Sequence, residues 1–157
     1  MKKNLIFPTV TLFVIAILFA GGCKSAVPGP SDNPKKVIIY LKAVRIDGKK
    51  HLEMSDSNNP DSTVIDSLAT IVNPGDTVVW EITSFRRIKK IEKIGRKTPG
   101  QIINKDAEQI PDTKKFKLVV PDDAPYDTKE KYDIKFKGWV SKSTTIDPYL
   151  RIPKEVD

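Results

Sequence analysis

Residues 77–83 read Thr-Val-Val-Trp-Glu-Ile-Thr and follow the segment Asn73-Pro74-Gly75-Asp76. Because proline fixes φ and glycine leaves it free, this segment predicts a turn. In the run that follows, Val78, Trp80 and Ile82 occupy alternate positions and so share one face of an extended strand. The turn and the strand together indicate a β-sheet that carries a tryptophan into its core.

The same period-two alternation extends to both sides of this strand, and no stretch of the domain has a convincing helical period. The clearest case is residues 130–137, where Tyr132, Ile134 and Phe136 alternate with charged residues, as in a sheet covered on one face only. A proline at position 148 should break or bend the last strand. The clearest of the expected strands are residues 37–41, 62–72, 77–83, 115–120, 130–137 and 144–153.

This pattern predicts an all-β fold, namely an antiparallel two-sheet sandwich of about seven or eight strands. Residues 35–157 are long enough to form it as one domain with a real apolar core. We expect four large residues in that core: Trp80, Phe116, Ile134 and Phe136.

The first 22 residues have the layout of a secretory signal, with Lys2 and Lys3 before an apolar run that ends in Gly21-Gly22. The apolar run is short for a membrane-spanning helix, so cleavage after export is expected. The stretch Phe19-Ala20-Gly21-Gly22-Cys23 resembles the lipobox of bacterial lipoproteins, although Ala20 stands where that family usually has leucine. The resemblance implies that Cys23 is acylated and becomes the new N-terminus.

Residues 23–34 are rich in proline, glycine and small polar residues, which indicates a flexible linker. Cys23 is the only cysteine, so after acylation the fold must be held by packing without a disulfide. No aspartate follows Cys23, which by the same resemblance favours the outer membrane over the inner one. The expected location is therefore the bacterial cell envelope, with the lipid anchor in a membrane.

The stretch from Leu68 to Trp80, which includes Gly75-Asp76-Thr77-Val78-Val79-Trp80, resembles the corresponding turn and strand of cupredoxins. The resemblance implies a cupredoxin-like sandwich over roughly residues 37–153. Cupredoxins bind copper through two histidines and a cysteine, often with a methionine. Here no histidine follows Trp80, and the late Cys-His-Met cluster is absent. We therefore expect a domain with no copper and no other cofactor.

Other site chemistry is equally sparse. His51 is the only histidine, and we expect it in an exposed polar loop; no serine has the context of a hydrolase nucleophile. Three aspartates, Asp56, Asp61 and Asp66, lie in a Ser/Asn-rich stretch that could supply oxygen ligands to calcium, but the glycine and glutamate of an EF-hand are missing. No catalytic residue and no metal site are predicted.

The strongest anomaly of composition is the stretch 86–97, in which Glu92 is the only acid. Isoleucines recur there every three residues, which fits either a short helix or a strand with a bulge. The lysines could simply be solvated on a sheet edge, or they could form a patch for an anionic partner. The candidate contact residues are Arg86, Arg87, Lys89, Lys90, Lys93, Arg96 and Lys97.

These features predict a lipid-anchored, metal-free binding or assembly module of the bacterial envelope, without enzymatic activity. Its partners would be the membrane, through the lipid, and an anionic lipid, glycan or acidic envelope protein; nucleic acid is not expected. Two alternatives stay open. One is a copper-binding electron-transfer protein with atypical ligands that include His51, and the other is an envelope hydrolase.

Overall fold

The computed structural model describes residues 33–84, 88–96, 100–138 and 142–155. Within these ranges the protein is all-β, as predicted, with eleven strands and no helix. The strands are β1 (Lys36–Ile46), β2 (Lys49–Asp56), β3 (Asn59–Ile65), β4 (Ala69–Ile71), β5 (Thr77–Ser84), β6 (Lys90–Arg96), β7 (Glu108–Gln109), β8 (Phe116–Val119), β9 (Thr128–Lys137), β10 (Thr144–Ile146) and β11 (Tyr149–Ile152).

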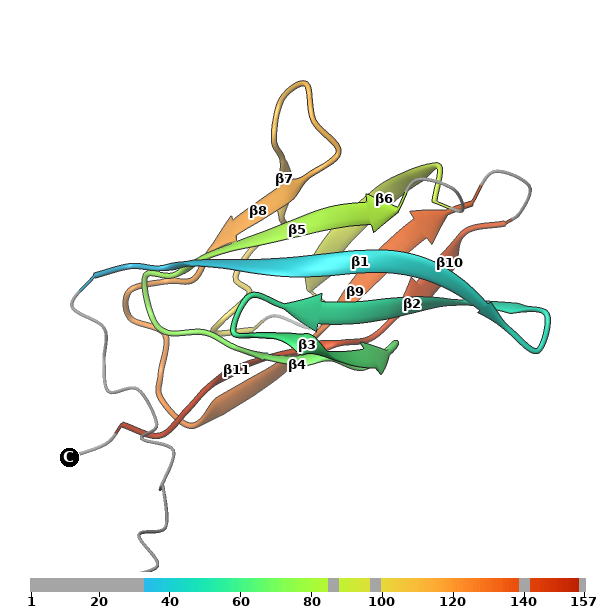
Figure 1. The fold of residues 1–157 in the computed structure, drawn as a ribbon. Helices are drawn as coiled ribbons and strands as arrows, with labels where there is room; N and C mark the ends of the chain where they lie inside the picture. The colour runs from blue at the N-terminus through green and yellow to red at the C-terminus, as the bar shows by residue number, and fades with distance from the viewer. Residues whose placement is uncertain (1–32, 85–87, 97–99, 139–141, 156–157) are drawn as a thin grey trace, which may run out of the picture.

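Two sheets form the layers of a β-sandwich (Figure 1). The first sheet has six strands in the order β3-β2-β1-β5-β8-β7. The second sheet has the order β10-β9-β11-β4, and β6 also pairs with β9. Because Ile134 and Phe136 of β9 pair with β6 and also with β10, β6 must lie on the opposite edge of β9 from β10.

The predicted sandwich is antiparallel at most of its strand pairs and departs from that prediction at two. Strand β1 pairs with β5 in parallel, and β4 pairs with β11 in parallel, so both sheets are mixed. The reason is that alternation along a strand reports which face each residue occupies but carries no information on the direction of the neighbouring strand.

The number of strands is also larger than the predicted seven or eight. The expected strand 62–72 is divided between β3 and β4 at Asp66, which has a positive φ of 60°. The expected strand 144–153 is divided into β10 and β11 at Asp147-Pro148, where the proline predicted a break. Strand β2 was not predicted at all, because its polar sequence reads as a loop.

The turn that precedes β5 is anchored by a buried carboxylate, that of Asp76. Its Oδ1 accepts a hydrogen bond from the backbone N–H of Lys35 at 2.8 Å, and its Oδ2 accepts one from Asn73 at 2.8 Å. Gly75 has a φ of +81°, and a Cβ there would lie 2.9 Å from Oδ1 of Asp122. The Asp76 carboxylate therefore holds the starts of β1 and β5 together. Gly75 provides the positive φ that the turn needs, and it has no Cβ to crowd Asp122.

The predicted core residues Trp80, Phe116, Ile134 and Phe136 are all buried, which confirms that part of the interpretation. The ring of Trp80 meets that of Tyr132 edge-on, with centroids 5.5 Å apart, and its Nε1–H donates to the Tyr132 Oη at 3.1 Å. The described buried cluster runs from Val37 to Ile152. Residues 33–157 thus contain all of it, and we expect this part of the chain to fold by itself.

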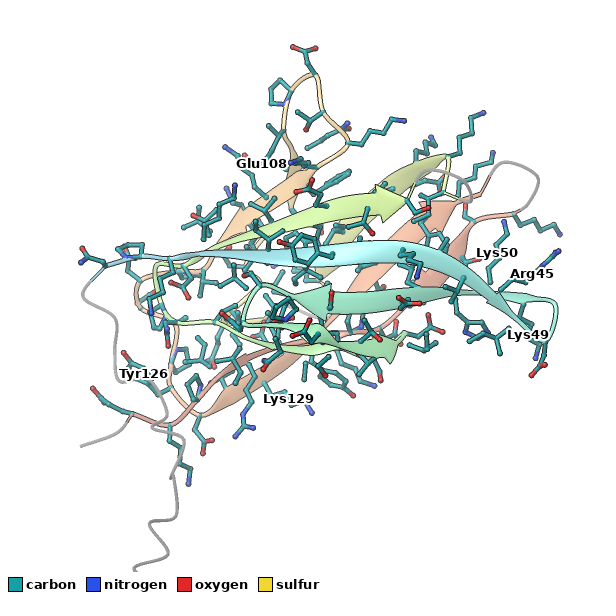
Figure 2. The ribbon with its side chains drawn as sticks, viewed as in Figure 1. Arg45, Lys49, Lys50, Glu108, Tyr126 and Lys129 are labelled. Carbon is teal, nitrogen blue, oxygen red and sulfur yellow. The ribbon has the colours of Figure 1, made fainter. Side chains whose placement is uncertain are left out.

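The two ends of the sandwich differ in what they present. The start of β1 lies at one end of the sandwich, and the tip of the β1–β2 hairpin lies at the other (Figure 1). Arg45, Lys49 and Lys50 belong to that hairpin (Figure 2). No helix in the described part of the chain is long and apolar enough to cross a membrane.

Candidate functional site: the basic face of the second sheet

The basic stretch singled out in the sequence forms strand β6 in its described part. Ile88, Ile91 and Ile94 are buried, and the pairing of β6 with β9 shifts register between Ile91 and Lys93. Of the two readings, the strand with a bulge is therefore correct and the helix is wrong. Arg86, Arg87 and Lys97 lie outside the described residues.

Local groups engage several of the described cations of this stretch. The Nζ of Lys93 lies 2.9 Å from Oδ2 of Asp106, and Nη1 of Arg96 donates to the carbonyl of Asn104 at 2.9 Å. The Nζ of Lys90 lies 3.8 Å from Oε1 of Glu92. The stretch by itself is therefore less available to a partner than its composition suggests.

Strand β9 adds a second row of cations beside β6. Its inward positions are Tyr132, Ile134 and Phe136, so the alternate positions point outward. Strand β11 continues the same surface through Arg151, which pairs with Lys129. We call the outward cations of these three strands the basic face; they are Lys90, Lys93, Lys129, Lys131, Lys135, Lys137 and Arg151.

The register of the second sheet places like charges directly opposite one another on this face. Lys90 pairs with Lys137, Lys93 with Lys135, and Lys129 with Arg151. Directly opposed like charges destabilise a sheet, by a fraction of a kcal/mol for each pair. Three such pairs on one face are difficult to explain by folding stability, and places where a sequence departs from local stability rules are often functional sites.

One carboxylate, that of Glu92, lies among the lysines at the β6 edge. Its Oε2 accepts a hydrogen bond from the Ser143 hydroxyl at 2.6 Å and lies 3.7 Å from the Nζ of Lys135. The Ser143 hydrogen bond is the largest cause that lowers the pKa of Glu92; burial, the next cause, opposes it, and the charges of Lys135, Lys90 and Lys137 lower the pKa further. Glu92 is thus held in its ionised form and balances part of the basic face.

The end of the basic face near β11 differs from the β6 edge in what its cations contact. The Nζ of Lys129 lies 4.1 Å from the centroid of the Tyr149 ring, and that of Lys131 lies 5.2 Å from it. Cation–π attraction therefore holds two ammonium groups at a single ring. Figure 2 labels Lys129 on this sheet.

The basic face also has an apolar margin on β4. Ile71 pairs with Arg151, and 41% of its surface is exposed. Its neighbour Ala69 pairs with Tyr149. Cationic, aromatic and aliphatic side chains are thus adjacent on one outer surface.

Glu130 does not contribute to the charge of this face, although it lies between Lys129 and Lys131 in the sequence. Its carboxylate accepts hydrogen bonds from the backbone N–H groups of Ile102 at 3.0 Å and Ile103 at 2.8 Å, and from that of Gln101. A Cβ at Gly100 would collide with it. The only acid within β9's lysine-rich first half is therefore used inside the fold.

A cavity of about 280 Å³ lies at the segment that Glu130 holds. Its lining residues are Gly100, Gln101, Asn104, Pro121, Asp123 and Pro125. This lining has no cation, no histidine and no cysteine, so it offers neither an anion site nor a set of soft metal ligands.

The expectation that His51 lies in an exposed loop was wrong. It belongs to β2, and its Nδ1 lies 2.5 Å from Oδ2 of Asp66, whose Oδ1 accepts from the backbone N–H of Leu52 at 2.7 Å. Met54 points the other way, into the core. Since residues 51 and 54 of one strand occupy opposite faces, they cannot share a metal ion.

The Asp66–His51 pair supplies two parts of a hydrolytic triad. The third part is not found in the described ranges, where the only hydrogen bond of the His51 ring is the one to Asp66. The arrangement as described orients a histidine but gives it no nucleophile to activate.

The three aspartates considered for calcium do not converge. Asp56 is buried and accepts from the backbone N–H groups of Asn58 and Asn59, whereas Asp61 is exposed and Asp66 binds His51. Over the residues that the structure describes, no three His, Cys, Asp or Glu side chains form a group able to hold a metal ion.

Cys23, the predicted lipidation site, lies outside the described residues together with most of the linker. A scan of protein-family models found no match to the chain, and a search of curated proteins found no significant relative.

The lysines of β9 and Arg151 are the residues that the sequence analysis missed. For β9 the signal is the cationic side of the alternation at residues 130–137, which the sequence analysis interprets only as the uncovered face of a sheet.

Proposed function

We propose that this protein is a lipid-anchored, metal-free binding module of the bacterial envelope, tethered through Cys23, that holds an anionic partner on its basic face. The single observation that supports it most is the set of three like-charge pairs across β6, β9 and β11. An anionic partner would relieve this repulsion, so that binding and the stability of the second sheet would rise together.

The proposed site is centred on β9 and β11, whereas the site predicted from the sequence is centred on the stretch 86–97. The described part of the stretch 86–97 contributes Lys90 and Lys93, which lie near Glu92 and Asp106, while the cations near the Tyr149 ring and Arg151 are on β9 and β11. Lys129, Lys131 and Arg151 are therefore the main proposed contact residues, and the residues of the stretch extend the surface toward the β6 edge.

The cupredoxin-like character of the sandwich is part of the same proposal. It is supported by the Gly75-Asp76 turn, which ties two strands together, and by Trp80 in the core. Nothing in the described geometry favours the electron-transfer alternative, because His51 and Met54 face opposite ways. The hydrolase alternative is left with an Asp-His pair alone.

Binding to a soluble acidic polysaccharide, polygalacturonate, tests the anionic-partner proposal. Residues 33–157 should bind it with an affinity that falls steeply as salt is added. A variant with Lys129→Gln, Lys131→Gln and Arg151→Gln should lose most of this binding. A control with the same change in net charge, Lys36→Gln, Lys49→Gln and Lys117→Gln on exposed positions of the first sheet, should keep it. Equal binding by both variants would remove the basic face from the proposal.

The anchor is tested separately in cells that process lipoproteins. Labelled palmitate should be incorporated into the full chain and not into a Cys23→Ser variant. A labelled product in both, or in neither, would overturn the lipid-anchor part of the proposal and leave the basic face untouched.

A further inference from the structure

Starting from the proposed function, we propose that the anionic partner of the basic face is the surface of a lipid bilayer, on which the sandwich lies with its second sheet down. The contact would consist of the cations of β9 and β11, the Tyr149 ring and the exposed Ile71. The inference rests on the proposed function and goes further by naming the partner and the orientation.

The mixture of side chains on this face fits a membrane interface. Lysine and arginine extend their stems along apolar material while their charged ends stay in water, and tyrosine prefers the depth of the lipid headgroups. Arg151 and Ile71 are cross-strand neighbours, and so are Lys131 and Tyr149. On β9, β11 and β4, a cation therefore lies beside an aromatic ring in one cross-strand pair and beside an aliphatic side chain in the other.

The geometry of Tyr149 favours lipid over a glycan. A sugar ring binds to an aromatic side chain by stacking on an open ring face, but here the ammonium groups of Lys129 and Lys131 already lie 4.1 and 5.2 Å from the ring centroid. The two ammonium groups remain hydrogen-bond donors beside the ring, which suits phosphate groups. Headgroup phosphates can move to meet them, because lipids diffuse in the plane of the bilayer.

The position of the tether permits this orientation. The chain enters the sandwich at one end, at Asn33 (Figure 1). Residues 23–34 can span at most about 40 Å when fully extended, which is similar to the length of about 35 Å expected for the eleven residues of β1. A domain held by such a linker can lie on its side and is not forced to stand on its end.

Electrostatics sets the size of the expected effect. Each lysine or arginine near an anionic bilayer raises the partition coefficient about fivefold. Removing Lys129, Lys131 and Arg151 should therefore lower it about 100-fold, with a further loss from Ile71→Ser.

Vesicles of phosphatidylglycerol with phosphatidylcholine, compared with vesicles of phosphatidylcholine alone, test the inference on residues 33–157. We expect binding to the anionic vesicles only, about 100-fold weaker for the variant Lys129→Gln, Lys131→Gln, Arg151→Gln. The control Lys36→Gln, Lys49→Gln, Lys117→Gln should bind like the parent. Thermal unfolding confirms that each variant is folded before it is compared.

Two exposed aliphatic residues on opposite sheets report the orientation. Ile71 on the second sheet is 41% exposed and Val119 on the first is 50% exposed. In Ile71→Cys and Val119→Cys, each carrying an environment-sensitive fluorophore, the emission should shift to the blue on anionic vesicles at position 71 only. Residues 33–157 contain no other cysteine, so the label is specific.

The outcomes separate the inference from the proposed function. Polygalacturonate binding without vesicle binding would overturn the bilayer and leave an acidic glycan as the partner of the same face. Vesicle binding with equal shifts at positions 71 and 119, or a shift at 119 alone, would overturn the orientation. Loss of binding to both anionic materials would overturn the proposed function as well.

Discussion

The outer faces of the two sheets differ in how their charges are paired. On the first sheet opposite charges meet: Lys42 pairs with Glu53 at 3.0 Å, and Lys115 lies 2.9 Å from Glu81. On the second sheet like charges meet, most openly at Lys129 and Arg151. Both faces are the polar sides of strands whose other sides share one core.

This difference teaches that alternation is satisfied equally by a face arranged for stability and by a face arranged for contact. Complementary cross-strand pairs each add a fraction of a kcal/mol, and like pairs subtract a similar amount. The outer face of the first sheet therefore has pairs that folding alone would favour, although Arg45 and Lys50 oppose each other near the tip of the β1–β2 hairpin. The second is arranged against folding at several positions, which is why we assign the contact to it.

The largest effect is expected at Glu130 on β9. It tests whether the inward side of this strand supports stability while the outward side supports binding. Glu130→Ala leaves the backbone N–H groups of Ile102 and Ile103 without their acceptor and should lower the free energy of unfolding by about 3 kcal/mol. Urea unfolding measures the loss. Vesicle binding by the folded fraction should not fall, because Glu130 is not on the basic face.

Glu130→Gln is the matched control, since the amide oxygen can still accept one of these hydrogen bonds. It should lose less stability than Glu130→Ala. If alanine costs less than about 1 kcal/mol, the carboxylate does not hold the 101–103 segment in the way described.

The second effect concerns the core that both faces share. Tyr132→Phe removes the acceptor of the Trp80 Nε1–H, which is then buried without a partner, at a cost of about 1–3 kcal/mol. Tyr149→Phe, on the outer face, keeps its ring for Lys129 and should change stability little. A similar loss in both variants would contradict the special role of the buried hydroxyl.

The same residue predicts behaviour at high pH. Burial raises the pKa of Tyr132 above its ordinary value of 10.0. As the pH rises, Tyr132 therefore ionises in the unfolded chain before it ionises in the folded one. The contribution of the neutral Tyr132 to stability is fully present below pH 10.0 and is lost as the pH rises beyond it. In alkaline unfolding series, Tyr132→Phe should lack this part of the pH dependence while Tyr149→Phe retains it.

The sequence was sufficient for the parts of the fold that local pattern encodes. The alternation around Trp80 and Ile134 identified two strands and their inward residues, and Pro148 marked the break between β10 and β11. The sequence did not reveal strand direction. Strands β1 and β5 pair across about 40 residues, and no local period records their relative direction. His51 was misplaced for a related reason: its partner Asp66 is fixed only after β2 and β3 pair.

The candidate site shows the same division. Contiguous charges in residues 86–97 drew attention because composition is visible in one dimension. The lysines of β9 are separated by inward-facing residues, and their meeting with Lys90, Lys93 and Arg151 depends on the register of three strands. Like-charge pairing is a property of that register and could not be read from any single segment.

A charge exchange tests the comparison of the two faces directly, with a smaller effect. Lys129→Glu turns the Lys129–Arg151 pair into a complementary one and should raise the free energy of unfolding by about 0.5 kcal/mol, while vesicle binding falls. Glu53→Lys makes the reverse change opposite Lys42 and should lower it by a similar amount, with binding unchanged or slightly stronger. A lower free energy of unfolding in both variants would mean that the charges of cross-strand partners do not decide whether a substitution stabilises or destabilises the sheet.

The smallest effect compares one carboxylate from each sheet, Glu92 beside the basic face and Glu108 on β7 (Figure 2). Hydrogen bonds from Ser143 and Lys105, respectively, are the largest causes that lower their pKa values below 4.5. A lowered pKa means that the ionised carboxylate stabilises the fold above pH 4.5 and that this contribution is lost as the pH falls below it. Thermal unfolding should therefore show Glu92→Gln and Glu108→Gln each slightly less stable than the parent at pH 7 and converging with it in acid.

The two variants should diverge in binding, because only Glu92 lies among the cations of the basic face. Glu92→Gln leaves Lys90 and Lys135 without their counter-charge and should strengthen partition into anionic vesicles, up to about fivefold for one unit of charge at the surface. Glu108→Gln changes the net charge by the same amount on the other sheet and should leave partition unchanged. A gain in both variants would show that vesicles respond to net charge alone, and the second sheet would then have no distinct claim to the contact.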